Sequence, residues 1–229
     1  MPGIPNDMPP ETRGRARYGF LLLATVGLLA VQGTVDPGAF QQVVVTALAG
    51  ASLLLAFHAA MLSPRLIAFA GGVAVAALVV SVLRATTGGI GEGAALTMNA
   101  ALVALGPPAI AVGLVRDLRA TGVVQIQSLF GVLSLYVLIG MSFGFVYASI
   151  DRFGGDPFFA GGDSATVAHC IYFSFTTLAT VGYGDLVART DLGHTLSVSE
   201  ALIGQIYLVT VVSLIVSNLR RPRRDDVGA

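Results

Sequence analysis

Residues 176–185, "TTLATVGYGD", separate two apolar segments and consist mainly of small, polar and glycine residues. In hydrocarbon every unpaired backbone group is costly, so a non-helical segment at membrane depth survives only inside protein or beside water. Gly182 and Gly184 have no Cβ atom and adopt positive φ at little steric cost, which lets successive carbonyl groups turn to the same side. We therefore expect a column of carbonyl oxygens suited to a dehydrated monovalent cation, formed by Thr180, Val181, Gly182 and Tyr183.

The chain as a whole has the composition of an integral membrane protein. Its 229 residues are 55% hydrophobic and 11% charged, and the mean hydropathy is +0.80, which is far more apolar than an ordinary soluble domain. The formal net charge is zero, which argues against a nucleic-acid partner. The single cysteine, Cys170, excludes an intrachain disulfide and gives no metal cluster.

Six apolar segments are close to the ~20 residues that cross the hydrocarbon layer as a helix: 18–35, 40–62, 66–83, 94–115, 123–150 and 196–219. A seventh, 165–178, is too short to cross and is expected to be re-entrant or interfacial. The predicted fold class is an all-α membrane protein with six transmembrane helices. The first segment is also open to interpretation as a signal peptide, although no clear small-residue cleavage site follows Ala30.

Arginines divide unevenly between the two predicted sides of the membrane. With a cytoplasmic N-terminus, the outer side receives only Arg84, Arg152 and Arg189. Because positive charge favours the cytoplasmic side, both termini of this multi-pass cell-membrane protein are predicted to be cytoplasmic. The inner side receives Arg13, Arg15, Arg17, Arg65, Arg116, Arg119 and the final group. That final group is also expected to meet anionic lipid head groups; it consists of Arg220, Arg221, Arg223 and Arg224.

Residues 180–185, "TVGYGD", match the selectivity-filter signature of potassium channels, and the chain resembles that family. In these channels four loops surround an axis and their carbonyl groups replace the hydration shell of K⁺. The resemblance implies a homotetramer, because one chain holds one filter and no different subunit is assumed. It further implies a turn permitted by Gly184 and K⁺ coordination by Thr180, Val181, Gly182 and Tyr183.

The resemblance also implies roles for residues around the filter. Asp185 would brace the filter and add negative charge at its outer mouth. Some bacterial channels have a glutamate four residues before the filter threonine, where this chain has Thr176, so another donor is expected to brace Asp185, with Tyr172 as a candidate. Asp185, Tyr172 and Thr176 are together expected to brace the filter. Gly204 stands where family members commonly have a hinge glycine.

The short apolar segment before the filter is similar to the family's pore helix. Asp163 or Ser164 is available as its N-cap. Its aromatic residues Tyr172, Phe173 and Phe175 resemble the packing that holds potassium filters at the right diameter. On the last helix, helical spacing places four residues on one face that we expect to line the cavity: Gln205, Leu208, Val212 and Val216.

The chain is therefore divided into a flexible cytoplasmic tail (1–17), a four-helix transmembrane bundle (18–115), a pore domain of outer helix, pore helix, filter and inner helix (123–219), and a short basic cytoplasmic tail (220–229). A voltage sensor needs arginines at every third position of its fourth helix, but residues 94–115 contain none. The bundle is thus not predicted to sense voltage. A kink is expected at Gly106, Pro107 and Pro108. The short connection 116–122 predicts that the bundle packs beside its own subunit's pore.

The predicted function is passive, potassium-selective conduction through a homotetrameric pore, with K⁺ as the permeant ion and no cofactor. Two alternatives remain open. One is a non-conducting or regulatory membrane subunit. The other is a potassium transporter subunit, although such proteins usually repeat the hairpin four times in one chain. An enzyme is not predicted, because no nucleophile, base and orienting group occur in a recognisable arrangement.

Overall fold

The computed structural model describes residues 17–35, 38–87, 92–121, 126–162 and 165–219. These residues form helices and one isolated bridge between Phe159 and Ala188. The helices are α2 (Arg17–Thr34), α3 (Ala39–Ala59), α4 (Pro64–Thr87), α5 (Glu92–Ala104), α6 (Gly106–Thr121), α7 (Ile126–Phe153), α8 (Val167–Leu178) and α9 (Asp191–Leu219). The all-α prediction is confirmed for this part of the chain.

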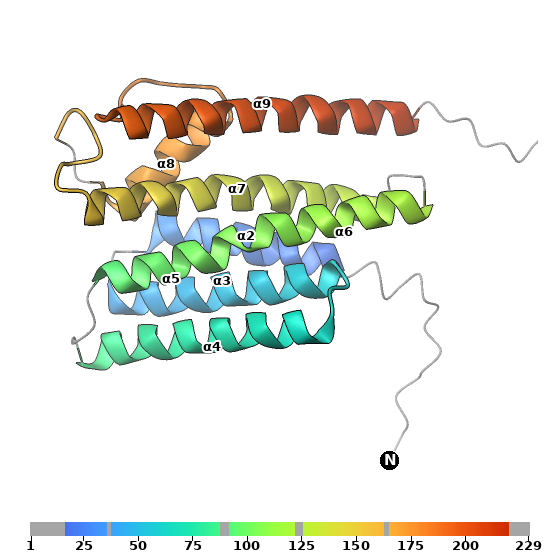
Figure 1. Ribbon diagram of the computed structural model, residues 1–229, viewed down its shortest axis with the longest axis horizontal. Helices are drawn as coiled ribbons and strands as arrows, with labels where there is room; N and C mark the ends of the chain where they lie inside the picture. Colours follow the sequence, from blue (N-terminus) through green and yellow to red (C-terminus); the bar gives the residue numbers. More distant parts are fainter. Residues whose placement is uncertain (1–16, 36–37, 88–91, 122–125, 163–164, 220–229) are drawn as a thin grey trace, which may run out of the picture.

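The long helices lie along one common direction and form a bundle (Figure 1). The helices α3 and α6 end, and α4 and α7 begin, at one end of it. The helices α2 and α4 end, and α3 and α5 begin, at the other end, where α7 also ends and α9 begins; we call this the filter end. The 12-residue α8 lies between α7 and α9 in the half of the bundle next to the filter end.

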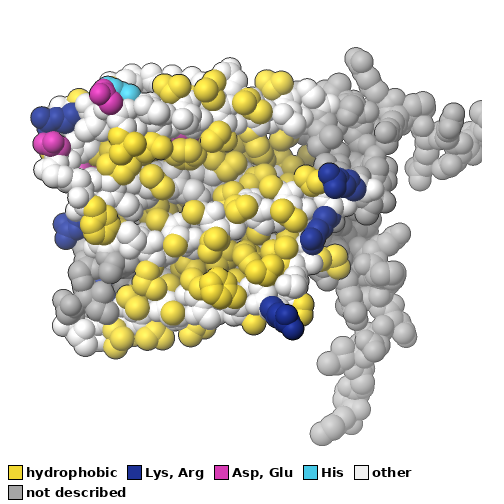
Figure 2. Space-filling view, viewed as in Figure 1, with side chains coloured by type: hydrophobic (Ala, Val, Ile, Leu, Met, Phe, Trp, Pro, Cys, Tyr) yellow, Lys and Arg dark blue, Asp and Glu magenta, His cyan; other side chains and the backbone are white. Residues whose placement is uncertain are grey.

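Four helical stretches of the described residues are long and apolar enough to cross a membrane: Ala39–Ala59, Pro64–Thr87, Leu96–Arg116 and Leu129–Phe153. The helices α2 and α8 are shorter apolar helices. On the face shown in Figure 2, hydrophobic side chains cover the middle, and charged side chains gather near the two ends. These features support a multi-pass membrane protein, whereas the count of six crossings stays a prediction.

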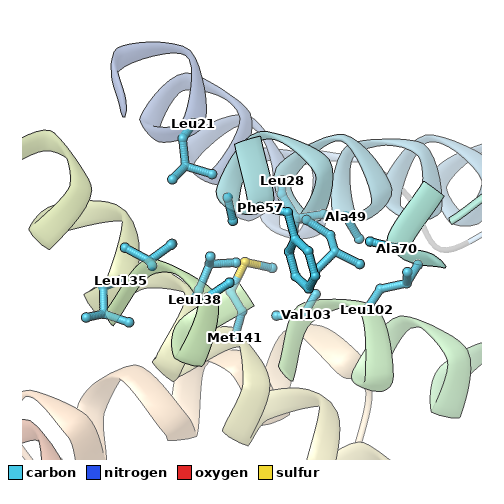
Figure 3. Packing of buried hydrophobic residues seen from close by; sticks show 14 of the residues in the cluster. Leu21, Leu28, Ala49, Phe57, Ala70, Leu102, Val103, Leu135, Leu138 and Met141 are labelled. Carbon is cyan, nitrogen blue, oxygen red and sulfur yellow. The ribbon is translucent and has the colours of Figure 1, made fainter. Parts of the chain in front are cut away.

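The first helices and α7 share one hydrophobic core, so the predicted bundle is not packed separately from the predicted outer pore helix. Figure 3 shows side chains from α2, α3, α4, α5 and α7 meeting in this core. Leu138 and Met141 of α7 are almost fully buried against Leu28 of α2 and Phe57 of α3 within the same cluster. Within one chain, α2, α5 and α6 all pack on α7, as the short connection led us to expect.

The fourth apolar segment is interrupted where it was predicted to kink. The helix α5 ends at Ala104 and α6 begins at Gly106. Proline has no N–H to donate within a helix and its ring clashes with the preceding turn, so Pro107 and Pro108 fit only in the first turn of a new helix. The helix α6 then continues to Thr121, so the prediction of a loop from residue 116 was wrong. Residues 122–125 lie outside the described part of the chain.

Two further boundaries differ from the sequence prediction. The cap of α8 is Thr166, whose hydroxyl accepts a hydrogen bond from the His169 N–H at 3.2 Å. The predicted caps Asp163 and Ser164 lie outside the described residues, and the helix begins too late for either to serve. The helix α9 begins at Asp191 rather than at residue 196, since the hydroxyl of Thr190 accepts from the Gly193 N–H at 3.2 Å. A polar first turn is hidden from a search for apolar residues.

The described arginines at helix ends follow the predicted division. Arg65 lies in the first turn of α4, and Arg116 and Arg119 lie in the last turns of α6, so all three are at the end opposite the filter. Arg84 and Arg152 lie in the last turns of α4 and α7, at the filter end. The arrangement of charges is observed, and its orientation in a membrane stays a prediction.

Candidate functional site

The predicted filter segment follows α8 directly and folds back over the end of that helix. The N–H of Thr180 donates to the carbonyl of Thr177 at 2.9 Å. The N–H groups of Val181 and Gly182 both donate to the carbonyl of Thr176, at 2.8 and 3.1 Å. Otherwise unpaired groups at the helix C-terminus are thereby satisfied, and the filter is attached to α8 through its main chain.

Left-handed residues alternate along this segment. The φ angles of Thr180, Gly182 and Gly184 are 55°, 54° and 80°, and Val181 and Tyr183 between them have no positive φ. Because left-handed and right-handed backbone conformations alternate, neighbouring N–H groups form a concave nest. Here the nest faces the carbonyl of Thr176. Both glycines thus have the predicted conformation. The positive φ of Thr180, which is unfavourable for a β-branched residue, was not predicted.

The carbonyl groups of Thr180 and Val181 point away from α8. In a planar trans peptide the C=O of one residue is opposite to the N–H of the next, and no cis peptide occurs in the described residues. Since the N–H groups of Val181 and Gly182 point back to α8, the preceding carbonyls point outward. On that side the chain is open, with Val181 51% and Tyr183 71% exposed. The segment offers oxygen atoms to a space that one chain does not fill.

Tyr172 of α8 contacts the end of the segment at two points. Its hydroxyl donates to Oδ2 of Asp185 at 2.8 Å, and its ring stacks on Tyr183, with centroids 6.3 Å apart and planes at 6°. The Leu186 N–H donates to the other carboxylate oxygen at 3.0 Å. The Tyr172 hydrogen bond favours the ionised form and lowers the pKa of Asp185 below its ordinary value. The helix α8 therefore contacts the predicted filter segment at both of its ends.

Thr176 contacts the predicted filter segment through its backbone and not through its side chain. Its hydroxyl donates to the carbonyl of Phe173 at 2.9 Å, one turn back within α8, as short β-branched hydroxyl residues commonly do in helices. This directs the side chain into α8 rather than toward Asp185. The contact of Thr176 with the filter is made by its backbone carbonyl.

An aromatic cluster places α8 beside α7. Phe173 lies edge-on to Tyr147, Phe158 and Phe159, with centroid distances of 5.4, 5.9 and 5.6 Å. All three partners are almost fully buried. Of the other predicted cuff residues, Tyr172 faces Tyr183 and Phe175 lies against Gly140 of α7. Phe173 and Phe175 thus hold α8 to α7, and Tyr172 holds it to the predicted filter segment.

The segments before α8 and after the filter are joined to each other. The Ala160 N–H donates to the carbonyl of Val187 at 2.9 Å, and the Arg189 N–H donates to that of Phe158 at 2.8 Å. The carboxylate of Asp151, at the end of α7, accepts from the Phe158 N–H at 2.8 Å. The C-terminal end of the predicted filter segment is thereby connected to α7 as well as to α8.

The helix α9 packs on α8 through Gly204. A Cβ atom at this position would lie 2.0 Å from the carbonyl oxygen of Leu178, at the end of α8, and α9 runs through Gly204 without a break. The hinge role of Gly204 stays a prediction, but a requirement for close packing is evident. Gln205 and Leu208 are exposed on the single chain. The side chains of Val212 and Val216 lie outside the described residues, so the cavity face stays a prediction.

One buried acid at this site was not predicted from the sequence. Glu200 of α9 is fully buried and is hydrogen-bonded to Tyr147 of α7 and Ser174 of α8. The available signal was a glutamate within an apolar helix, which is costly in a membrane and therefore marks a site of interest. Its partners lie 53 and 26 residues away in the sequence, so the spacing alone does not reveal them.

Comparison with known proteins supports an ion-channel domain in this part of the chain. A family model described as "Ion channel" matches residues 131–221, less than half of the chain, which include most of α7 and all of α8 and α9. The inward rectifier potassium channel Kirbac3.1 of Paramagnetospirillum magnetotacticum is 43% identical over 51 residues. That similarity covers 22% of this chain and only 17% of the relative. No solved structure matches this chain significantly.

Proposed function

We propose that four copies of this chain surround a pore that conducts K⁺ selectively and passively. The observation that carries the proposal is the backbone of the filter segment, where the N–H groups of residues 180–182 bind to α8 and the carbonyl groups of Thr180 and Val181 point away from it. In such an arrangement the carbonyl oxygens of Thr180, Val181, Gly182 and Tyr183 replace the hydration shell of K⁺. The Thr180 hydroxyl adds a layer of oxygen at the inner end.

The open carbonyl groups of the filter favour assembly, and exposed apolar groups around them offer a contact surface. Val181 and Tyr183 are exposed in one chain, as is the face of α9 that points away from α7 and α8. That face consists of Val198, Leu202, Ile203, Ile206, Leu208 and Val209. Because open filter carbonyls are costly in hydrocarbon without partners, neighbouring copies around a closed axis are needed to enclose them. Ion-channel families commonly assemble in this way, which supports a homotetramer.

The remaining chain supplies the membrane anchor. We place both termini on the cytoplasmic side, because Arg65, Arg116 and Arg119 lie opposite the filter end. Anionic lipids would meet Arg220, Arg221, Arg223 and Arg224, which lie beyond the described residues.

Without arginines in residues 94–115, opening is not driven by voltage through that segment. The proposed protein is a channel and not an enzyme, with K⁺ as its cargo.

Ion flux through purified protein in liposomes tests this function. We expect K⁺ efflux down its gradient, and Na⁺ efflux lower by at least about a hundredfold, because the smaller ion is poorly coordinated by the same carbonyl ring. Flux at rates far above transporter turnover separates a channel from a transporter subunit. A well-folded tetramer without K⁺ flux would contradict the proposal and favour the regulatory-subunit alternative.

Loss of the Tyr172 hydroxyl is expected to make the channel more sensitive to external acid. The Asp185 carboxyl has a lowered pKa, so its hydrogen bond stabilises the filter fully above the ordinary pKa and loses this effect as pH falls through the lowered one. In Tyr172→Phe the pKa returns toward its ordinary value, and K⁺ efflux should fail at a higher external pH than in the wild type. The measurement is K⁺ efflux as external pH is lowered from neutral.

The matched control for this prediction is Tyr18→Phe. Tyr18 lies at the start of α2, at the end of the bundle opposite the filter, and its hydroxyl lies beside Gly113 of α6. The acid midpoint of this variant should match that of the wild type. If Tyr172→Phe also leaves the midpoint unchanged, the hydrogen bond to Asp185 does not support the conducting filter.

A further inference from the structure

Three helices meet at a buried polar cluster directly behind the filter. It consists of Tyr147 of α7, Ser174 of α8 and Glu200 of α9, each 0% exposed. The Tyr147 hydroxyl lies 2.7 Å from Oε2 of Glu200, and the Ser174 hydroxyl contacts Oε1. Ser174 is two residues from Thr176, whose carbonyl binds the filter N–H groups. The cluster therefore joins the outer, pore and inner helices at the level where the filter is attached.

The hydrogen atoms in this cluster can be counted. Ser174 Oγ lies 2.6 Å from the carbonyl oxygen of Gly140 and also contacts Oε1 of Glu200. A serine hydroxyl has one hydrogen, and both neighbours are acceptors if Glu200 is ionised. One of the two oxygen pairs would then lack a hydrogen at hydrogen-bonding distance. A proton on Oε1 satisfies every contact, because Glu200 donates to Ser174, which donates to Gly140.

The surroundings of Glu200 also favour the neutral form. An ionised carboxylate removed from water is very costly unless it is paired with positive charge. The hydrogen-bonding partners of Glu200 are uncharged hydroxyl groups. Among the described residues, the other titratable groups that interact with this cluster are Tyr136 of α7 and Cys170 of α8, and a phenol and a thiol bring no positive charge.

We propose that Glu200 is held as a neutral carboxylic acid and acts as a positioning residue for the filter. It accepts from Tyr147 and donates to Ser174, so a single side chain fixes the inner helix to both other helices of the pore. The helix α8, on which the filter N–H groups are fastened, is thereby prevented from shifting. This inference rests on the proposed function for its effect on selectivity, but the proton itself is independent of conduction.

The proton is tested by infrared spectroscopy of the purified wild-type protein and Glu200→Gln at neutral pH. The difference spectrum is expected to contain the band of one protonated carboxyl group that is lost in the variant. A difference confined to carboxylate bands would overturn the proposal. Because this measurement needs no ion flux, it decides the protonation state even if the protein proves not to conduct.

The positioning role is tested by the ratio of K⁺ to Na⁺ flux in liposomes. A glutamine amide donates to Ser174 and accepts from Tyr147, so Glu200→Gln should keep a ratio within about twofold of the wild type. Glu200→Ala deprives the buried Tyr147 hydroxyl of its acceptor and separates Ser174 from α9, and its ratio should fall by about tenfold or more. Equal loss in both variants would show that charge is required, and an unchanged ratio in Glu200→Ala would show that the filter does not depend on this residue.

A second variant keeps the test decisive if Glu200→Ala does not assemble. Ser174→Ala removes one hydroxyl and little volume, and it deprives Glu200 of its acceptor and Gly140 of its donor. The flux ratio of assembled Ser174→Ala should fall in the same direction as that of Glu200→Ala. If it equals the wild-type ratio, the hydrogen-bonded connection from Glu200 to α8 has no positioning role.

Discussion

Replacement of Gly182 by alanine is expected to reduce K⁺ flux to background while the protein still folds and assembles. The φ angle of Gly182 is +54°, where an alanine Cβ costs about 1–2 kcal/mol, and the cost arises in each of the four proposed copies. A rotated peptide relieves this strain, but it also turns a carbonyl out of the proposed ring. A Cβ at this position meets nothing within 4 Å in the single chain, so folding of that chain is not blocked. Flux from liposomes and size-exclusion chromatography measure the two effects.

Gly162→Ala is the matched control for this prediction. Gly162 also has a positive φ, +76°, and a Cβ built there likewise meets nothing within 4 Å, but it precedes α8 and is not in the filter. The backbone strain is therefore similar and the position differs. Flux through Gly162→Ala should stay close to that of the wild type. If both variants lose flux equally, or if Gly182→Ala conducts normally, the left-handed filter backbone is not what coordinates the ion.

Replacement of Gly204 by alanine is expected to lower thermal stability and K⁺ flux together. The added Cβ would lie 2.0 Å from the carbonyl oxygen of Leu178 and 2.9 Å from its carbonyl carbon. These are backbone atoms, so α9 must move away from the end of α8. Overpacking of this kind costs about 1–3 kcal/mol, and the displaced helix carries Glu200 away from Ser174. The measurement is the temperature at which the assembled species disappears on size-exclusion chromatography, with flux measured on unheated protein.

Gly72→Ala distinguishes this packing effect from a general effect of alanine in a membrane helix. Gly72 lies in α4, and a Cβ built there meets nothing within 4 Å. The variant should be as stable as the wild type or slightly more so, because alanine favours a helix over glycine by about 1 kcal/mol. If Gly204→Ala alters flux at unchanged thermal stability, Gly204 acts as a hinge and the close contact with Leu178 is not important.

Most helices could be located from the sequence because apolar length is a local property. The break at Leu105 followed from two adjacent prolines, which act through their own geometry. The ends were less accessible, as α9 shows: its first turn is polar and begins after the Thr190 cap. A hydropathy pattern detects the part of a helix that faces lipid or core and is silent about a helical turn that extends beyond it.

In the candidate site, as for the helices, the sequence predicted those features that depend on a single residue's own geometry. Positive φ at Gly182 and Gly184 followed from the absence of Cβ atoms. The contacts that position the segment depend on tertiary structure. They include the buried Glu200, whose partners lie on two other helices. The direction of the Thr176 side chain likewise could not be predicted, because an i−3 bond within α8 competes for its hydroxyl.

Electron cryo-microscopy of the purified full chain in lipid nanodiscs containing K⁺ tests the central claim most directly. We predict four copies around one axis, with density for ions on that axis between the carbonyl oxygens of Thr180, Val181, Gly182 and Tyr183. Replacement of K⁺ by Na⁺ should remove or rearrange that density. A monomer or dimer, or a tetramer whose carbonyl groups at these positions face away from the axis, would contradict the account.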